Sequence, residues 1–79
     1  MHISKAVAKR IKILCKEKNI SINRLATLSG VTQSTIDSIL KGKSRNPQLV
    51  TLMKISNGLG ISIVEFFDFP PLINAEYDE

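Results

Sequence analysis

The chain has 79 residues, 43% of them hydrophobic, so it has room for one small domain with a modest core. Its 11 Lys and Arg residues against 7 Asp and Glu residues give a net charge of +4, and no stretch approaches the roughly 20 apolar residues of a membrane span. The single cysteine, Cys15, excludes an internal disulfide and lacks the spaced partners of a zinc site, so we expect a cytoplasmic chain with no metal and no cofactor.

Five helices are predicted from the spacing of apolar residues and from the residues that favour helix ends. The first helix covers about residues 4–18. Ser21 is a good N-cap for the second helix, Gly30 marks a tight turn, and Thr32 is a good N-cap for the third helix. Residues 21–42 are therefore predicted to form two short helices joined by a turn.

The third helix is predicted to be two-faced. On a wheel of about 100° per residue, its apolar residues fall within an arc of about 100°: Ile36, Ile39 and Leu40. Polar residues occupy about 140° on the other side: Gln33, Ser34, Asp37, Ser38 and Lys41. The second and third helices together fit a helix-turn-helix that presents its second helix to the DNA major groove. The alternative is a helical bundle in which the polar face is only solvated.

The rest of the chain is predicted to add two helices and a tail. Pro47 suits the first turn of a fourth helix, because its missing N–H and fixed φ cost nothing there. Ser62 caps a short fifth helix, and the Pro70-Pro71 pair is expected to prevent any further helix. We therefore divide the chain into a domain of residues 1–67 and an acidic tail of residues 68–79, loosely ordered unless docked.

The charges are separated along the sequence. Residues 1–54 hold all 11 basic residues and only Glu17 and Asp37, a net charge of +9, whereas the five acidic residues beyond them leave a net of −5. A solvated face usually mixes both signs, but a basic block that contains a polar helix face suits a polyanion. The charge pattern favours nucleic acid as the partner.

The segment from residue 25 to residue 67 resembles the Cro/cI-type (XRE-like) helix-turn-helix family, and the resemblance extends over about residues 4–67. It rests on a Leu-Ala pair, a Gly-Val-Thr turn, a Gly-Lys-x-x-x-Pro run and a Leu-Gly-Ile-Ser helix end. Ten positions fall in register: Leu25, Ala26, Gly30, Val31, Ile36, Gly42, Pro47, Leu59, Gly60 and Ser62. The resemblance implies an all-α, compact, five-helix, lambda-repressor-like DNA-binding domain with the helix-turn-helix at helices two and three.

The resemblance also implies which residues contact DNA. The predicted base contacts are Gln33, Ser34, Asp37 and Ser38. Gln33 has a donor and an acceptor for adenine N6 and N7, whereas Asp37 either accepts from cytosine N4 or interacts with Lys41 one turn on. The predicted phosphate contacts lie at the start of helix two and after helix three: Ser21, Ile22, Asn23, Lys41, Lys43, Ser44, Arg45 and Asn46.

The sequence departs from the family pattern in two ways. Ile22 stands where a glutamine commonly touches phosphate, so we expect that contact to come from the backbone or from Asn23. Cys15 and Leu40 stand where an Arg and a Glu often pair. An apolar contact in place of a partly buried ion pair need not cost stability, and Cys15 is therefore interpreted as a packing residue.

A homodimer is predicted through helix five and its surroundings, with four apolar interface residues: Val50, Val64, Phe67 and Phe69. In the alternative, Phe67 and Phe69 fold back onto the chain's own core. No catalytic group is predicted, because the only histidine, His2, has no nucleophile or carboxylate beside it in the sequence and is expected at an exposed, frayed end.

The predicted function is that of a sequence-specific, double-stranded DNA-binding transcriptional regulator. We expect a repressor that acts as a homodimer on an inverted-repeat operator, without enzymatic activity and without a membrane partner. The alternative is an antitoxin or protein-binding adaptor that uses the same domain together with its acidic tail. That tail would bind a partner protein through its apolar residues: Phe67, Phe69, Leu72, Ile73 and Tyr77.

Overall fold

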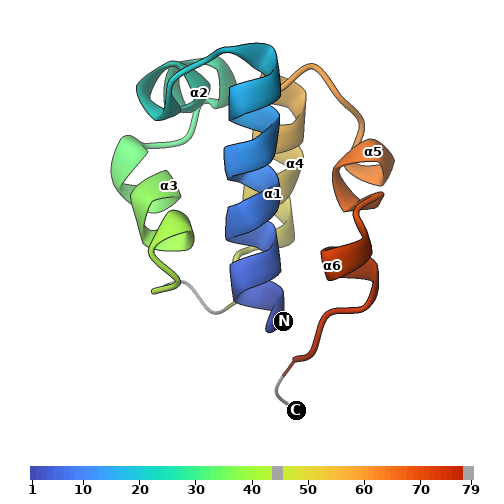
Figure 1. The fold of residues 1–79 in the computed structure, drawn as a ribbon. Coiled ribbons are helices and arrows are strands. Elements are labelled where there is room, and N and C mark those ends of the chain that lie inside the picture. The colour runs from blue at the N-terminus through green and yellow to red at the C-terminus, as the bar shows by residue number, and fades with distance from the viewer. Residues whose placement is uncertain (44–45, 78–79) are drawn as a thin grey trace.

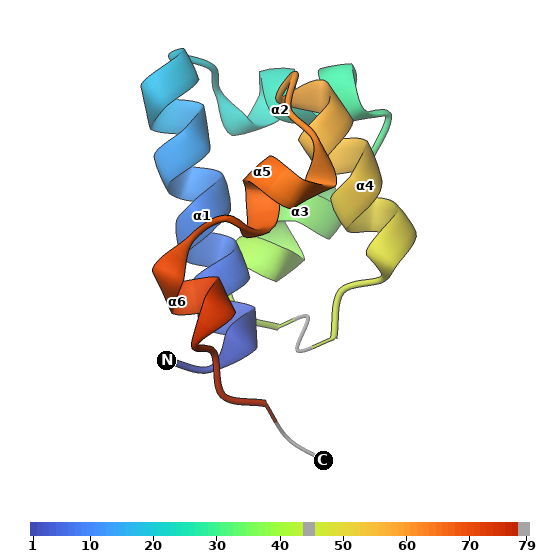
Figure 2. The same ribbon diagram turned by 90° about the vertical axis from the view of Figure 1, so that its right-hand side faces the viewer.

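The computed structural model describes residues 1–43 and 46–77, and this part of the chain forms six helices and no strand. The helices are α1 (Ile3–Lys18), α2 (Ile22–Ser29), α3 (Gln33–Leu40), α4 (Leu49–Gly58), α5 (Ile63–Phe67) and α6 (Pro70–Ile73). Helices α2 and α3 lie on one side of α1, and α5 and α6 lie on the other side (Figure 1). Turned by 90°, the molecule shows α5 and α6 in front, with α3 behind them (Figure 2). The all-α fold class is confirmed.

Three predicted helix starts are confirmed by hydroxyl caps. The side chains of Ser21, Thr32 and Ser62 each accept the backbone N–H three residues on, over 3.0, 3.2 and 3.1 Å. Such a cap satisfies one of the N–H groups that have no partner within the first turn of a helix. Because each cap involves residues only three apart, these boundaries could be predicted from the sequence.

The start of α1 differs from the prediction for His2. This residue is half-buried rather than exposed, and its Nδ1 atom accepts the Ser4 N–H over 3.1 Å, which makes it the N-cap of α1. The expectation of a frayed end was wrong because the chain beyond α6 returns to this point. Ile3 N–H donates to the Glu76 carbonyl over 2.8 Å, and Glu76 N–H donates to the Met1 carbonyl over 3.0 Å.

The start of α4 also differs from the prediction. The helix begins at Leu49, and Gln48 is its N-cap in an extended conformation. The Gln48 carbonyl accepts the N–H groups of Thr51 and Leu52, so the helical hydrogen bonds begin only after Pro47. Pro47 therefore precedes the helix instead of occupying its first turn, and its fixed φ is equally compatible with the extended chain there.

The prediction that Pro70-Pro71 prevents further helix was wrong. Both prolines lie at the first positions of α6, where a missing N–H costs no hydrogen bond because those groups have no partner within the helix. Leu72 is 7% exposed and joins the core, and α6 packs against α1. The described part of the predicted tail is thus docked, and the core extends beyond the boundary predicted at residue 67.

The core lies between the helices and includes side chains from all six. The largest fully buried apolar side chains are Phe66, Ile11, Leu25, Ile36, Ile39, Ile55 and Val7. Cys15 belongs to this core, and burial raises the pKa of its thiol. Leu40 is half-buried and packs against the same core. Within the described residues, no helix is long and apolar enough to cross a membrane.

Candidate nucleic-acid interface

The turn between α2 and α3 is fixed by backbone geometry at Gly30. This residue has a φ of 68°, in the left-handed region that glycine adopts most readily. Its N–H and the Val31 N–H point back to carbonyls in the last turn of α2, at Thr27 and Ala26. This hydrogen-bonded end stops α2 and lets the chain turn directly into α3.

Helix α3 has one buried and one outward face. Ile36 and Ile39 are 0% and 1% exposed, and they anchor the helix against α1 and the core. Gln33 and Ser34 are exposed on the other face. The remaining two predicted base contacts, Asp37 and Ser38, are half-buried. The polar face predicted from the sequence therefore lies on the surface, and its first turn is the most accessible part.

The start of α2 offers backbone groups more than side chains. The Ser21 hydroxyl is engaged with the Arg24 N–H, and the Ile22 side chain is half-buried against the core. Asn23 is exposed. The first N–H groups of a helix have no partner within it and carry the positive end of the helix dipole, so this end is suited to receive a phosphate.

The segment after α3 carries the predicted cations. Lys41, Lys43 and Asn46 are exposed, and the Lys43 N–H donates to the Ser38 carbonyl over 2.9 Å. That hydrogen bond holds the start of the loop against the end of α3. Two further predicted phosphate contacts, Ser44 and Arg45, lie outside the described residues.

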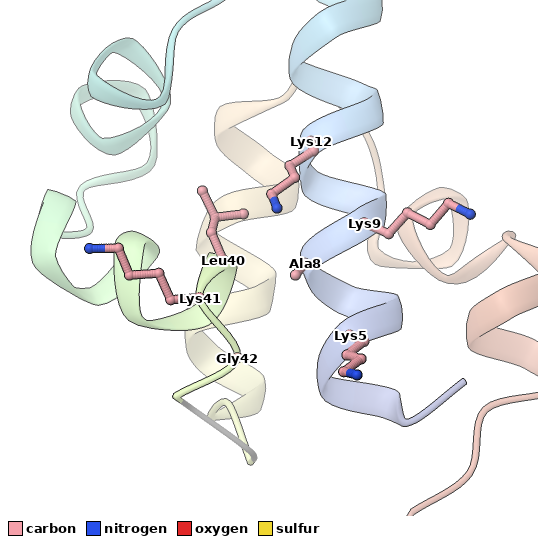
Figure 3. Close-up of a pocket in the computed structure, with 7 residues that line it drawn as sticks. All are labelled: Lys5, Ala8, Lys9, Lys12, Leu40, Lys41 and Gly42. Carbon is pink, nitrogen blue, oxygen red and sulfur yellow. The ribbon is translucent and has the colours of Figure 1, made fainter.

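A groove between α1 and the end of α3 places more cations beside Lys41. It has a volume of about 310 Å³ and is lined by Lys5, Ala8, Lys9, Lys12, Leu40, Lys41 and Gly42 (Figure 3). The α1 lysines were not among the residues selected from the sequence, because a single lysine is most often only a solvated side chain. Their regular spacing along α1 is the signal that could have identified them.

Arg10 has a different role from the lysines around it. Its Nε donates to the Phe66 carbonyl over 2.9 Å, and its Nη2 donates to the Glu65 carbonyl over 2.6 Å. The guanidinium also lies 5.1 Å from the centre of the Phe69 ring, as in a cation–π contact. Arg10 thus ties α1 to the end of α5, where a cation also interacts favourably with the helix dipole.

The four predicted dimer residues fall into two groups. Val50 and Val64 are 54% and 75% exposed. Phe67 and Phe69 are half-buried and pack against the core, and the Phe67 ring meets Phe66 edge-on with 5.5 Å between ring centres. The alternative of a fold back onto the chain's own core therefore applies to both aromatic residues. The two valines remain available to a partner.

Together, α2, the glycine turn and α3 with its outward polar face define a helix-turn-helix domain. Residues 10–71 match the Cro/C1-type HTH DNA-binding domain, so the chain belongs to that family. It is 37% identical over 62 residues to the HTH-type transcriptional regulator SlrR of Bacillus subtilis (strain 168). That match covers 78% of this chain but only 41% of SlrR.

Solved structures show the same fold. The structure of the prophage Lp1 protein 11 superposes with a TM-score of 0.78 and 40% identity, covering 87% of this chain and 91% of that protein. The restriction-modification controller protein C.AhdI from Aeromonas hydrophila superposes with a TM-score of 0.73 and 31% identity. That match covers 81% of this chain and 96% of C.AhdI. Both are thus similar to this chain over nearly their whole length.

Proposed function

We propose that this chain is a sequence-specific, double-stranded DNA-binding transcriptional regulator, a repressor that acts as a homodimer on an inverted-repeat operator. The observation that carries the proposal is the exposed polar face of α3, with Gln33 and Ser34 on its first turn and Lys41 at its end. The names of SlrR, a transcriptional regulator, and of C.AhdI, a controller protein, support a role in transcription.

In this proposal α3 enters the major groove and Gln33 reads a base. Its side-chain amide presents a donor and an acceptor side by side, which matches N7 and N6 of adenine. Ser34 and Ser38 each add one hydrogen bond, and Asp37 accepts from cytosine N4. Because three of these four side chains are short, DNA shape and bridging water supply part of the specificity.

The phosphate contacts flank the base contacts on both sides. At one end are the backbone N–H groups of Ile22 and Asn23 in the first turn of α2, beside Ser21, whose hydroxyl caps the Arg24 N–H. At the other end are Lys41, Lys43 and Asn46, and we propose Ser44 and Arg45 from the sequence alone. These contacts fix the position of the protein on the duplex and carry no sequence information themselves.

Replacement of Gln33 by alanine should weaken binding to the preferred site and leave binding to random DNA nearly unchanged. The expected loss on the preferred site is about 1 to 3 kcal/mol, the usual discrimination of a bidentate base contact. The preferred site is first obtained by selecting bound sequences from a random DNA pool. Affinities for that site and for a scrambled duplex are then measured by fluorescence anisotropy at one fixed salt concentration.

The matched control for this experiment is Lys43→Ala, an exposed residue after the same helix. Loss of a phosphate contact should weaken binding to both duplexes by the same factor, because the backbone is common to all sequences. If Gln33→Ala weakens both duplexes equally, Gln33 does not read sequence.

The proposed dimer forms through the exposed apolar side chains of α4 and α5. Val50 and Val64 are 54% and 75% exposed in the described part of the chain. A two-fold axis near them would place two α3 helices about 34 Å apart, which is one turn of DNA, and would require an inverted repeat.

Val64→Asp should shift the protein from dimer to monomer, because the new carboxylate would be buried in an apolar interface without a partner. Sedimentation equilibrium over a concentration series measures the shift. Ile73→Asp on α6 is the control, since Ile73 is 66% exposed and is not among the proposed interface residues. A parent protein that remains monomeric well above micromolar concentration, and binds a half-site without cooperativity, contradicts the dimer.

The packing of the C-terminal segment favours the regulator over the adaptor. Three of the five apolar residues that a partner-binding tail would use instead contact this chain's own core: Phe67, Phe69 and Leu72. Only Ile73 and Tyr77 of that set are exposed. A partner that needed all five side chains would have to displace α6 from α1.

A further inference from the structure

Four lysines form a continuous stripe along α1. Lys5, Lys9, Lys12 and Lys16 follow one another at intervals of four, three and four residues, so they fall within an arc of about 60° on the helix. All four are exposed. With a rise of about 1.5 Å per residue, the stripe is about 16 Å long.

The stripe borders the groove that leads to the end of α3. Lys5, Lys9 and Lys12 line that groove together with Lys41 and Gly42. Figure 3 shows Lys12 extending from α1 toward the α3 side, whereas Lys9 extends away from it. A second cavity of about 290 Å³ adjoins it, since Lys5 and Gly42 line both. The stripe is therefore continuous with the proposed phosphate contacts after α3.

Among the described residues, no acid lines either cavity beside the stripe. Glu17, the acidic residue of α1, lies about 80° or more from the stripe on the helix wheel. Lysines three or four residues apart on a helix repel one another. The stripe therefore costs stability in the free protein, and a bound polyanion would relieve that cost.

We infer that the lysine stripe of α1 binds the phosphate backbone of the same duplex whose major groove α3 enters. The inference rests on the proposed function. An extended row of cations fits a strand of phosphates better than one small anion, because duplex DNA carries about one negative charge per 1.7 Å of its axis. Because the stripe is continuous with Lys41, we assign its phosphate contacts to the same duplex that α3 binds.

The test compares two double variants that remove the same charge. Lys5→Gln/Lys12→Gln removes two lysines of the stripe. Lys18→Gln/Lys54→Gln removes two exposed lysines that line neither cavity. Binding to a duplex that contains the selected site is measured by anisotropy from 50 to 200 mM salt, and circular dichroism checks that each variant is folded.

Each lost phosphate contact should reduce the slope of log affinity against log salt by about 0.9. The stripe variant should therefore lose about 1.8 from the slope and bind on the order of 60-fold more weakly at 0.1 M salt. The control variant should keep the parent slope. A stripe variant with the parent slope overturns the inference.

A second measurement distinguishes DNA from a free anion. The chemical shifts of the α1 backbone amides are followed by NMR while either duplex DNA or inorganic phosphate is added to the parent protein. Shifts that saturate with phosphate alone at submillimolar concentration would assign a small-anion site and overturn the inference, whereas shifts that saturate only with duplex support it. The two proposals can fail separately. If Gln33→Ala leaves the preference for the selected site intact, the proposed function fails. If Gln33→Ala loses that preference but the stripe variant keeps the parent salt slope, this inference alone fails.

Discussion

Binding of this domain to duplex DNA should weaken by about 10³- to 10⁵-fold when salt rises from 50 to 200 mM. That range is expected for a protein that neutralises about six to ten phosphates, because each contact releases counterions condensed on the DNA. Residues 1–54 carry a net charge of +9, and the exposed lysines at the end of α3 flank the polar face. Fluorescence anisotropy at several salt concentrations, plotted as log affinity against log salt, measures the slope.

The salt experiment needs a control that shows the protein stays folded. The helical circular dichroism signal should be the same at both ends of the salt range, so that a change in affinity reports on contacts and not on unfolding. A slope near zero, or an absence of duplex binding at 50 mM salt, would contradict phosphate recognition by this surface.

The second large effect is expected for the core. Phe66→Ala should lower the free energy of unfolding by about 3 to 5 kcal/mol, because it removes the largest fully buried side chain and leaves a cavity. A domain of this size rarely has more stability than that to lose. We therefore expect the variant to be mostly unfolded at 37 °C. Urea denaturation, followed by circular dichroism, measures its free energy of unfolding.

Ile73→Ala is the matched control, since it also replaces a large apolar residue near the C-terminal end of the described chain. Ile73 is 66% exposed, so its replacement should change the free energy of unfolding by less than about 0.5 kcal/mol. Similar losses for both variants would mean that α5 does not hold the core together as the structure describes.

The contacts of Phe66 also show why Arg10 differs from the other cations of α1. The Phe66 carbonyl accepts from Arg10, whose guanidinium lies over Phe69. Arg10 lies on α1 between Lys9 and Lys12, so the sequence alone counts it with the basic block. Only the packed structure separates a cation that holds helices together from those that remain available to a polyanion.

The second half of the chain was predicted less well than the first. Pro70-Pro71 has a strong local signal for ending a helix, yet the same two residues begin α6. Helix propensity is decided within a few residues, whereas α6 is held by burial of Leu72 and by backbone hydrogen bonds between Glu76 and the first residues of the chain. Those contacts join segments about 70 residues apart in sequence, and no local pattern predicts them.

The sequence by itself determined the helix caps at Ser21, Thr32 and Ser62, the glycine turn, and the polar face of α3. Each depends on residues within about one or two helical turns, where spacing fixes geometry. The tertiary structure alone decided the docking of α6, the partial burial of Phe67 and Phe69, and the position of the α1 lysines beside Lys41. These features depend on which helix faces pack together, and packing is set by the shape and volume of the whole core.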